Sequence, residues 1–592
     1  MLEKKIGNVR LYVPDEDVWN RPAADEEEKQ LLEIVQSQDH EDYHAQITAR
    51  KSWTVMYQLA ESRANLIGWL KLKEHASVLE VGAGCGTVTS ALLEKGAVVT
   101  CQEENSIYCR CNALRHKDHP LVIHVASPGQ CEARLDQYDV ITVLDVPLTG
   151  QDAEPLLRML RRHLKPDGML VLAAKNKFGL KYWAGNKEMY THTYFAGLEN
   201  NGVRLYSKEG LGRLLYQTGF EQQEFYYPYP DERFALDIYS DRYLPKKGDL
   251  NYNIVNYEDD RMLLFDEQKV FDSIIEEEKF PFFANAFLCL AGAQGQASLT
   301  QETVYARYAC DRSREYAVCT QITGKDVRKY AVYPQGAAHI GHILQAYEKL
   351  RAQYAGTRLR FNRCIRRQDA DGSIYAEFEL LREKALQEQV EQAVIAGRME
   401  DVSDMLRTLI RLIRDPDQKN SKGFEMTGAF REVFGKDLQE DALRGTVCSE
   451  ISDIDLILPN ILAGEDGIWH VIDYEWTFFF PVPQNFIIYR TLFFLNHENP
   501  DRKELSMERL LEFAEIPQKE AVVYAQMEEA FQRYVTGGLV PYREMVNLMK
   551  RRFFNVTQLK ADYDRVVAQN ELLKGQGLWK AVRKIKKKLT GS

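Results

Sequence analysis

The sequence predicts a Rossmann-like α/β domain with a parallel sheet, followed by an α+β domain and a helical tail. Strand-like and helix-like runs alternate over residues 77–225, which is typical of a parallel sheet wound with helices. Beyond residue 300, alternating runs are joined by short turns and precede long helical stretches, which indicates an antiparallel sheet on a helical lobe. At 592 residues, the chain is about four times the usual ~150-residue domain. We therefore expect two or three separately cored domains.

Composition indicates a globular, cytoplasmic protein. Hydrophobic residues make up 45% and charged residues 28% of the chain, as in ordinary folded domains. No window approaches the ~18 consecutive apolar residues of a membrane span, and the N-terminus lacks the apolar core of a secretion signal. Ten irregularly spaced cysteines contain no paired C-x-x-C zinc pattern, so we expect thiols in a reducing compartment.

The α/β domain is predicted over residues 51–245, after an acidic lead-in over residues 1–50. A helix is expected at residues 53–70, where apolar residues recur at helical spacing. The predicted strands cover residues 78–81, 97–101, 121–125, 139–144 and 169–173. The pattern then breaks into Tyr-Tyr-Pro-Tyr-Pro and a Leu-Pro pair near residue 245, which we interpret as the domain boundary.

The second domain is predicted over residues 246–550. Strands are expected at residues 303–309, 316–322 and 326–332, with a turn at 311–313 between the first two. Helical sequence follows over residues 339–354 and 384–414. A small sheet followed by a mostly helical lobe fits a bilobal domain.

A glycine-rich turn closes the first predicted strand of the α/β domain. Residues 80–86 read Glu-Val-Gly-Ala-Gly-Cys-Gly, with Gly82, Gly84 and Gly86 between the strand and the next helix. Glycines let the backbone turn tightly and approach a ligand at a helix N-terminus. Such a turn fits a dinucleotide or S-adenosylmethionine, and a tight turn without a ligand is the alternative.

Two acids favour S-adenosylmethionine. Glu80 precedes the first glycine by two positions, where a carboxylate can meet the ammonium of an amino-acid ligand. Glu103 ends the next strand 23 residues later, where it can accept both ribose hydroxyls, and its neighbour Glu104 is the alternative. In this order, the strand, acid, glycines and second acid resemble class I S-adenosylmethionine-dependent methyltransferases. The resemblance implies that these acids and glycines bind the cofactor.

The sequence gives less information about the methyl acceptor than about the cofactor. Residues 145–148, Asp-Val-Pro-Leu, lack the Pro-Pro-aromatic sequence that amine and base methyltransferases often use, which favours an oxygen acceptor. Residues 175–185, rich in polar and aromatic groups, follow the fifth strand, where an acceptor pocket lies in this fold. They resemble a segment found in methyltransferases of bacterial surface-polysaccharide pathways, as do residues 199–200. A solvated loop with a core Trp183 is the alternative.

A second group of residues has the spacing of a phosphotransferase. Asp455 and Asn460 are separated by four residues, and Asp473 follows Asn460 by thirteen. Kinases use this spacing because the first Asp orients the nucleophile and accepts its proton, while the Asn and the later Asp hold magnesium. Residues 461–462 and 468–472 flank a Gly-rich turn, which predicts the hairpin that presents Asp473.

These stretches resemble the aminoglycoside-phosphotransferase and lipopolysaccharide-kinase branch. In a predicted strand, Lys329 resembles the phosphate-binding lysine of ATP sites, and Glu348, 19 residues on in a predicted helix, is its expected partner. There are three departures. Residues 453–455 read Asp-Ile-Asp where the family has His-Gly-Asp or His-Arg-Asp, and residues 473–475 read Asp-Tyr-Glu where it has Asp-Phe-Gly. No glycine-rich loop is recognised, and Gly292 and Gly295 are a poor substitute. A pseudokinase is therefore the alternative.

The tail predicts two helices. Over residues 556–573, apolar residues recur at alternating steps of three and four, with Asn570 at an inner position, which favours a short coiled coil over residues 551–577 and a homo-oligomer. A helix docked on the second domain is the alternative.

Residues 578–592 form a basic amphipathic pattern. The last 21 residues hold seven cations and no acid, so the rest of the chain has a net charge of −18. This pattern predicts binding to an anionic membrane surface, and a solvated end or an acidic protein partner is the alternative.

In order, these parts resemble the bifunctional methyltransferase-kinases that terminate polymannose O-antigen chains in bacteria. The resemblance implies ATP-dependent phosphorylation of the terminal sugar on a lipid-linked glycan, methylation of that phosphate, and recruitment to the inner membrane face and a glycosyltransferase. The net charge of −11 disfavours nucleic-acid binding. A methyltransferase with a scaffolding second lobe, or a small-molecule kinase-methyltransferase, are the alternatives.

Overall fold

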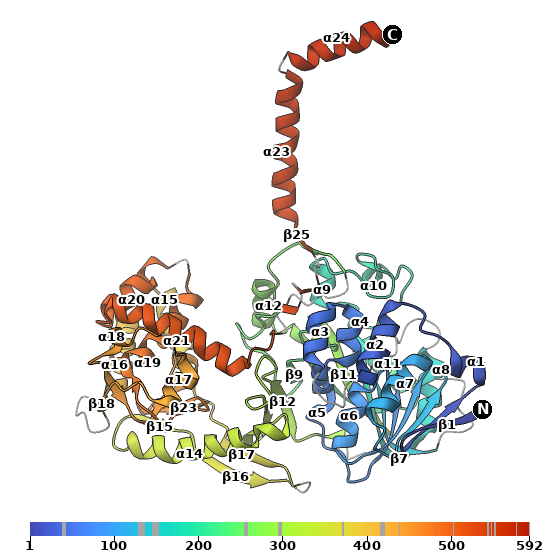
Figure 1. Ribbon diagram of the computed structural model, residues 1–592, viewed down its shortest axis with the longest axis horizontal. Coiled ribbons are helices and arrows are strands. Elements are labelled where there is room, and N and C mark those ends of the chain that lie inside the picture. The colour runs from blue at the N-terminus through green and yellow to red at the C-terminus, as the bar shows by residue number, and fades with distance from the viewer. Residues whose placement is uncertain are drawn as a thin grey trace. The chain divides into compact units, whose positions relative to one another are not determined.

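The computed structural model divides the chain into two compact units, and each is considered by itself (Figure 1). The first unit comprises residues 1–301 and 542–592, and the second comprises residues 302–541. The described residues are 1–37, 43–127, 136–144, 153–253, 259–293, 299–369, 372–414, 421–436, 438–500, 502–541, 544–545, 548–549, 552–575 and 577–590.

The first unit contains a mixed sheet with a parallel centre. Its strand order is β1-β2-β5-β4-β3-β6-β7-β11-β8-β9. Pairing is parallel from β2 to β7 and antiparallel at β1 and from β11 to β9. The strands are β1 (Leu2–Ile6), β2 (Val9–Val13), β3 (Ser77–Val81), β4 (Val98–Glu103), β5 (Val122–Val125), β6 (Tyr138–Val143), β7 (Leu164–Lys175), β8 (Gln222–Tyr229), β9 (Asp237–Ser240) and β11 (Ala286–Gly292).

Helices cover this sheet, which explains its apolar central strands. α6 (Thr87–Glu94) and α7 (Ser106–Arg115) pack on the parallel strands, and α8 (Ala153–Arg162) packs on β7. Val78, Leu79 and Val81 of β3 are all buried, as expected for a strand with both faces covered. The remaining helices of this part are α1 (Glu16–Asn20), α2 (Glu26–Ser37), α3 (His44–Arg50), α4 (Trp53–Leu59), α5 (Asn65–Gly68), α9 (Leu180–Trp183), α10 (Ala196–Glu199), α11 (Lys208–Gln217), α12 (Glu267–Glu276) and α13 (Phe280–Phe283).

The α/β fold class is confirmed, but three boundaries differ from the sequence-based expectation. The lead-in contributes β2, which pairs with β5 as part of the sheet. The expected helix over residues 53–70 is interrupted at Ala60, whose extended backbone ends α4. The boundary predicted near 245 lies inside the first unit, because β11 inserts between β7 and β8. Local sequence does not show which strands β11 pairs with, because its partners lie more than 60 residues away along the chain.

The second unit opens with an antiparallel sheet, as predicted. Its strand order is β12-β13-β14-β17-β16, and α14 (Ala337–Gln353) packs against β14, β16 and β17 (Figure 1). The strands are β12 (Thr303–Tyr308), β13 (Val318–Thr323), β14 (Asp326–Ala331), β16 (Cys364–Gln368) and β17 (Ile374–Glu379).

The rest of the second unit is mainly helical around one apolar core. Short strands carry the predicted hairpin: β21 (Ile461–Ala463) and β22 (Trp469–Val471) pair antiparallel, and β15 (Leu359–Phe361) extends them. The helices are α15 (Leu386–Ile395), α16 (Met399–Ile413), α17 (Gly428–Phe434), α18 (Glu440–Leu443), α19 (Gln484–Glu498), α20 (Met507–Phe513) and α21 (Gln518–Thr536). The remaining strands are β18 (Ser421–Gly423), β19 (Val447–Ser449), β20 (Ser452–Asp453), β23 (Thr477–Phe478) and β24 (Val482–Pro483).

The chain ends in two helices, α23 (Val556–Gly575) and α24 (Leu578–Thr590). They follow β25 (Phe553–Asn555), which pairs with β10 (Arg261–Leu263) in the first unit. The helix expected over residues 551–577 therefore begins at Val556. Among the described helices, none is long and apolar enough to cross a membrane.

Candidate active sites

The glycine turn lies between β3 and α6 in the first unit. Gly82, Gly84 and Gly86 have φ values of 77°, 52° and 85°, in the left-handed region that favours glycine. Packing also excludes side chains: a Cβ on Gly84 would lie 2.4 Å from Oε1 of Gln58, and one on Gly86 would lie 2.4 Å from Oδ1 of Asn112. The backbone of this turn therefore depends on glycine for both conformation and space.

Glu103 ends β4 beside the glycine turn. Its Oε2 accepts a hydrogen bond from the backbone N–H of Gly84 at 3.1 Å, and its Oε1 accepts one from the N–H of Asn105 at 2.8 Å. The structure thus brings the second acid to the turn, at the carboxyl edge of the parallel strands, where ligands bind in this type of sheet. The alternative acid, Glu104, is exposed and does not have these contacts.

Glu80 lies beneath the turn. Its carboxyl is buried, and its Oε2 accepts a hydrogen bond from the hydroxyl of Thr89 on α6 at 2.6 Å. Burial raises the pKa of Glu80 to about 7. The described contacts of Glu80 therefore tie β3 to α6, and contact with a ligand ammonium stays a prediction.

Buried charges surround the segment after β7. The Lys181 Nζ lies 2.9 Å from Asp231, and Arg233 contacts the same carboxylate at 2.6 Å, with all three side chains 2% exposed. Lys175 pairs with Glu232 at 2.9 Å. Burial opposes ionisation of Asp231, but Arg233 and Lys181 outweigh it and hold the pKa of that carboxyl well below its ordinary value. The site after β7 therefore contains fixed ionic charges.

Sequence reasoning missed part of this cluster. It singled out residues 175–185 but not Asp231, Glu232 and Arg233, although a charged run directly after a tyrosine-rich strand was a visible signal. Trp183 is 43% exposed, so the alternative of a core tryptophan is wrong. The acceptor sequence at residues 145–148 lies outside the described residues.

The second unit brings the predicted lysine and the predicted metal-binding aspartate together. Lys329 of β14 is 8% exposed; its Nζ donates to the carboxylate of Asp473 and, at 3.2 Å, to Oε2 of Glu475. Asp473 has φ of 55°, a conformation that non-glycine residues rarely adopt and that is concentrated at functional sites. The three charged groups form one cluster although Lys329 and Glu475 are 146 positions apart in the sequence.

Asp455 is held by a second ionic cluster. The guanidinium of Arg490 on α19 contacts the carboxylates of Asp455 and, at 2.6 Å, Glu528. Burial raises the pKa of Asp455, although Arg490 acts in the opposite direction. Nδ2 of Asn460 donates to the backbone oxygen of Asp455 at 3.0 Å, so the amide nitrogen faces the backbone of Asp455. These contacts link the predicted base to one predicted metal ligand.

The predicted partner of Lys329 is wrong. Glu348 is 61% exposed and pairs with Arg351 one helical turn later. The position on α14 that faces the ionic cluster belongs to His339, whose Nε2 lies 3.6 Å from Oε2 of Glu475. Glu475, which follows Asp473 by two residues, therefore pairs with the lysine, and the helix contributes a histidine in place of an acid.

The two glycines weighed in the sequence as a poor substitute for a glycine-rich loop, Gly292 and Gly295, precede the second unit in the chain. Gly292 ends β11 in the first unit, and Gly295 lies outside the described residues. The turn that joins β12 and β13, residues 309–317, contains no glycine. Instead, NH2 of Arg312 lies 2.7 Å from Oε1 of Glu475. In the described part of the chain, no group of three His, Cys, Asp or Glu side chains is arranged to hold a metal ion.

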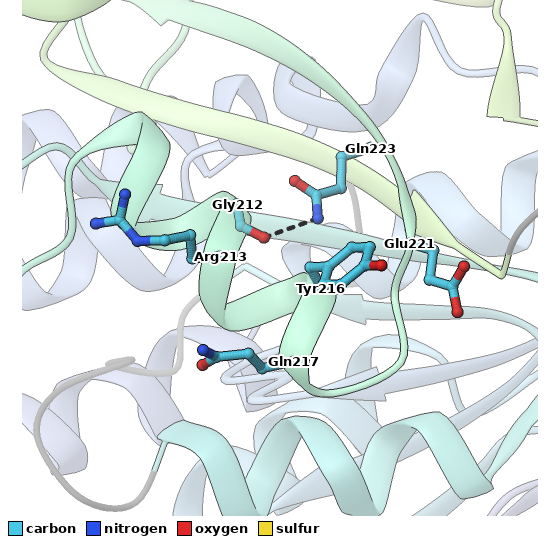
Figure 2. A pocket seen from close by; sticks show the side chains of 6 residues that line it. All are labelled: Gly212, Arg213, Tyr216, Gln217, Glu221 and Gln223. Atoms are coloured by element: carbon cyan, nitrogen blue, oxygen red, sulfur yellow. Dashed lines mark hydrogen bonds between the residues drawn. The ribbon is translucent and has the colours of Figure 1, made fainter.

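A surface pocket of about 450 Å³ lies elsewhere, between α11 and β8 (Figure 2). Figure 2 shows Gln223 bonded to the backbone oxygen of Gly212 across it, at 2.9 Å. β8 pairs with β11 so that Gln222 lies opposite Gly292, whereas the glycine turn follows the carboxyl end of β3. None of the residues that line the pocket belongs to the glycine turn or to the ionic clusters around Asp231, Lys329 and Asp455. Its lining residues are Gly212, Arg213, Tyr216, Gln217, Glu221 and Gln223.

The first unit combines a sheet with a parallel centre and a glycine turn at the carboxyl end of β3. Residues 52–224 match the family model described as "Methyltransferase domain". No curated protein matched the chain.

Three solved structures illustrate what the chain is similar to. A methyltransferase from Archaeoglobus fulgidus, described as SAM-dependent, is 15% identical, with 42% of this chain and 99% of that chain covered and a TM-score of 0.27. The bifunctional kinase-methyltransferase WbdD is 14% identical, with 83% and 95% covered and a TM-score of 0.26. Phosphoethanolamine N-methyltransferase 2 of Haemonchus contortus, in complex with S-adenosyl-L-methionine, is 16% identical, with 40% and 52% covered and a TM-score of 0.25.

Proposed function

We propose that this chain uses ATP to phosphorylate the terminal sugar of a growing bacterial surface polysaccharide. It then methylates the new phosphate with S-adenosylmethionine, and this cap ends chain growth. The observation that carries the proposal is the contact of Lys329 with Asp473 beside the Asp455–Asn460 pair, in a chain that also contains a methyltransferase domain. The order of sequence motifs supports the glycan as acceptor. A phosphate cap removes the hydroxyl that a polymerase would extend.

The kinase step requires help with a weakly acidic hydroxyl. A sugar hydroxyl has a pKa far above 7, so a base must accept its proton as it attacks ATP. Asp455 suits that role because burial raises its pKa, which makes the carboxylate a stronger base. The carboxylate of Asp473 and the amide oxygen of Asn460 are hard oxygen donors of the kind magnesium prefers, and both residues would hold the ion that neutralises the phosphate charge.

The methyl-transfer step requires mainly positioning. A sugar phosphate has a second pKa near 6, so at neutral pH its oxygen is already an anionic nucleophile. When bound, S-adenosylmethionine supplies an electrophilic methyl group on a sulfonium. The glycine turn and Glu103 would bind the cofactor and hold its methyl group toward the acceptor. Phosphate methylation therefore needs no dedicated base in the first unit.

The tail supports work at a membrane and in an oligomer. Exposed apolar residues run along α23, with no described partner for Leu559, Tyr563, Val566 and Leu573, which are 43–66% exposed; a second copy of this helix would bury them. On α24, exposed cations accompany Val582 and Ile585, which are at least 50% exposed. We propose that α24 binds the anionic inner face of the membrane, beside a glycosyltransferase and its lipid-linked glycan.

Phosphate transfer from ATP to a short lipid-linked glycan tests the kinase half. Wild-type protein should give a phosphorylated glycan, and Asp455→Asn should lower the rate by about 10²–10⁴-fold because the base is lost. Glu465→Gln, an exposed change in the turn between β21 and β22, should leave the rate unchanged. Wild-type protein that transfers no phosphate to the genuine acceptor overturns the kinase proposal.

A scaffolding second unit is the other candidate, and one observation favours it. Lys329 is neutralised by Asp473 and Glu475, so its charge is already satisfied within the chain. A scaffold would bind the glycosyltransferase without phosphate transfer, and Asp455→Asn would leave that binding and chain termination intact. The phosphate-transfer assay therefore separates the two functions.

Vesicle binding tests the membrane proposal. Full-length protein should sediment with vesicles that contain phosphatidylglycerol, and deletion of residues 578–592 should abolish this, since each cation contributes about 1 kcal/mol near anionic headgroups. Raising the salt concentration should weaken binding, because surface charges are screened. Equal sedimentation of the truncated protein would contradict the assigned role of α24.

A further inference from the structure

The turn between β12 and β13 in the second unit presents a cation in place of glycines. Residues 309–317 read Ala-Cys-Asp-Arg-Ser-Arg-Glu-Tyr-Ala. A protein that binds a nucleotide triphosphate must supply either closely approaching backbone N–H groups or charged side chains to the phosphates. Glycine permits the closest approach of backbone to a ligand, so a turn without glycine favours side chains as its phosphate donors.

Arg312 and Lys329 share one buried carboxylate. Glu475 is 2% exposed; its Oε1 lies 2.7 Å from the Arg312 guanidinium and its Oε2 lies 3.2 Å from the Lys329 ammonium. The two cations therefore lie side by side, separated only by the width of a carboxyl group. Arg312 remains 21% exposed, whereas Lys329 is 8% exposed. The guanidinium also lies over the ring of Trp476, 5.3 Å from its centre, which restricts its orientation.

Contacts with α21 hold this turn in place. The backbone N–H of Ser313 donates to the oxygen of Val535 at 2.9 Å, and the hydroxyl of Tyr316 contacts that of Tyr534. A Cβ on Gly537 would lie 2.9 Å from the Cβ of Ser313, so the turn and the helix end approach closely. A glycine-rich loop depends on mobility, whereas this turn has a fixed position from which a side chain can act.

We propose that Arg312 is a phosphate-binding residue for the nucleotide, acting with Lys329 where glycine-rich loops use backbone N–H groups. This inference rests on the proposed kinase function. Arg312, Lys329, Asp473 and Glu475 sum to zero charge. If Asp473 held the magnesium that accompanies a nucleotide, the two cations would face one remaining carboxylate, and the site would carry net positive charge toward the phosphates. Glu475 then positions both cations, and the planar guanidinium suits two phosphate oxygens.

A structural role for Arg312 predicts a different ligand dependence from a phosphate-binding role. If Arg312 only fixed the turn, its loss would disturb the whole site and weaken every ligand alike. If Arg312 binds phosphate, its loss should weaken ligands according to the phosphates they carry. Adenosine, ADP and ATP therefore discriminate between the two roles.

Calorimetric titration of the full chain with these three ligands and magnesium chloride tests the proposal. Arg312→Gln should weaken ATP and ADP about tenfold or more, since a charge-assisted hydrogen bond is lost, and should leave adenosine unchanged. Arg314→Gln is the matched control, because it removes a cation from the same turn that lies over Tyr333, 4.6 Å from its ring centre; it should leave all three affinities unchanged.

Arg312→Lys gives a second test if the glutamine variant fails to fold, because it retains the charge beside Glu475 but loses the planar fork. It should weaken ATP by a few-fold and leave adenosine unchanged. Unchanged ATP affinity in Arg312→Gln, or an equal loss for adenosine and ATP in either variant, overturns the role of Arg312 while the kinase proposal stands. Wild-type protein that binds no nucleotide overturns both.

Discussion

The two candidate sites consist of different chemical groups: mainly backbone in the first unit and charged side chains in the second. In the first unit, three glycines form a turn, and the carboxylate of Glu103 accepts a hydrogen bond from its backbone. In the second unit, the comparable turn contains no glycine, and a network of charged side chains from β14, the β12–β13 turn and residues 473–475 occupies the site. Both arrangements suit ligands that carry phosphate or charge, but one provides space and backbone donors and the other provides ionic groups.

This difference teaches where each unit is vulnerable. A site made of backbone is sensitive to added atoms, because a Cβ on Gly84 or Gly86 would lie 2.4 Å from a neighbouring side chain. A site made of buried charges tolerates no missing partner, because the remaining charge has neither water nor counter-ion. Substitutions that add volume should therefore damage the first unit, and substitutions that remove charge should damage the second.

The largest effect is expected from Arg490→Met. The change leaves the buried carboxylates of Asp455 and Glu528 without their shared cation, which should lower the free energy of unfolding by about 3–5 kcal/mol. Denaturant unfolding of the full chain measures this loss. Arg533→Met removes an exposed pair with Glu529 and should change stability by less than about 1 kcal/mol. Equal effects of the two changes would refute the dependence of the second unit on buried charge.

A pH series on Glu80→Gln should give the next largest effect. Burial raises the pKa of Glu80 from 4.5 to about 7, so the folded state binds the proton more tightly than the unfolded state between these values. Stability from this group is present below pH 4.5 and falls as pH rises to 7, by on the order of 3 kcal/mol. Thermal unfolding of the Gln variant should fall less steeply over this range than that of the wild type, and parallel curves would contradict the pKa shift.

The smallest effect is expected from Gly84→Ala. The added Cβ meets Oε1 of Gln58 at 2.4 Å, at a φ of 52°, so the first unit should lose about 1–3 kcal/mol together with affinity for S-adenosylmethionine. Gly96→Ala is the matched control: its φ is 73°, but nothing lies within 4 Å of the new Cβ. Calorimetry with the cofactor should show weaker binding for Gly84→Ala only; equal losses would show that backbone conformation, not space, sets the requirement.

Sequence reasoning reached the first site more completely than the second. The glycine turn and Glu103 follow consecutive strands, and parallel strands bring their carboxyl ends to one edge, so spacing alone predicted their proximity. Asp473 was recognised by its spacing from Asn460 and Lys329 by its resemblance to a phosphate-binding lysine, but the partner of the lysine was not recognised. A helix residue 19 positions away was the expected acid, whereas Glu475 stands two residues after Asp473 and reaches Lys329 through the fold.

By itself, the sequence determined the α/β class of the first unit and the antiparallel sheet at the start of the second. It also contains the motifs from which methyl transfer and phosphate transfer are proposed. Those properties follow from local periodicity and from residues adjacent along the chain. The tertiary structure alone decided that β11 belongs to the first sheet, that Asp231 and Arg233 form a cluster with Lys181, and that Arg312 shares Glu475 with Lys329. These are contacts between distant segments, and their energies depend on burial, which no local pattern encodes.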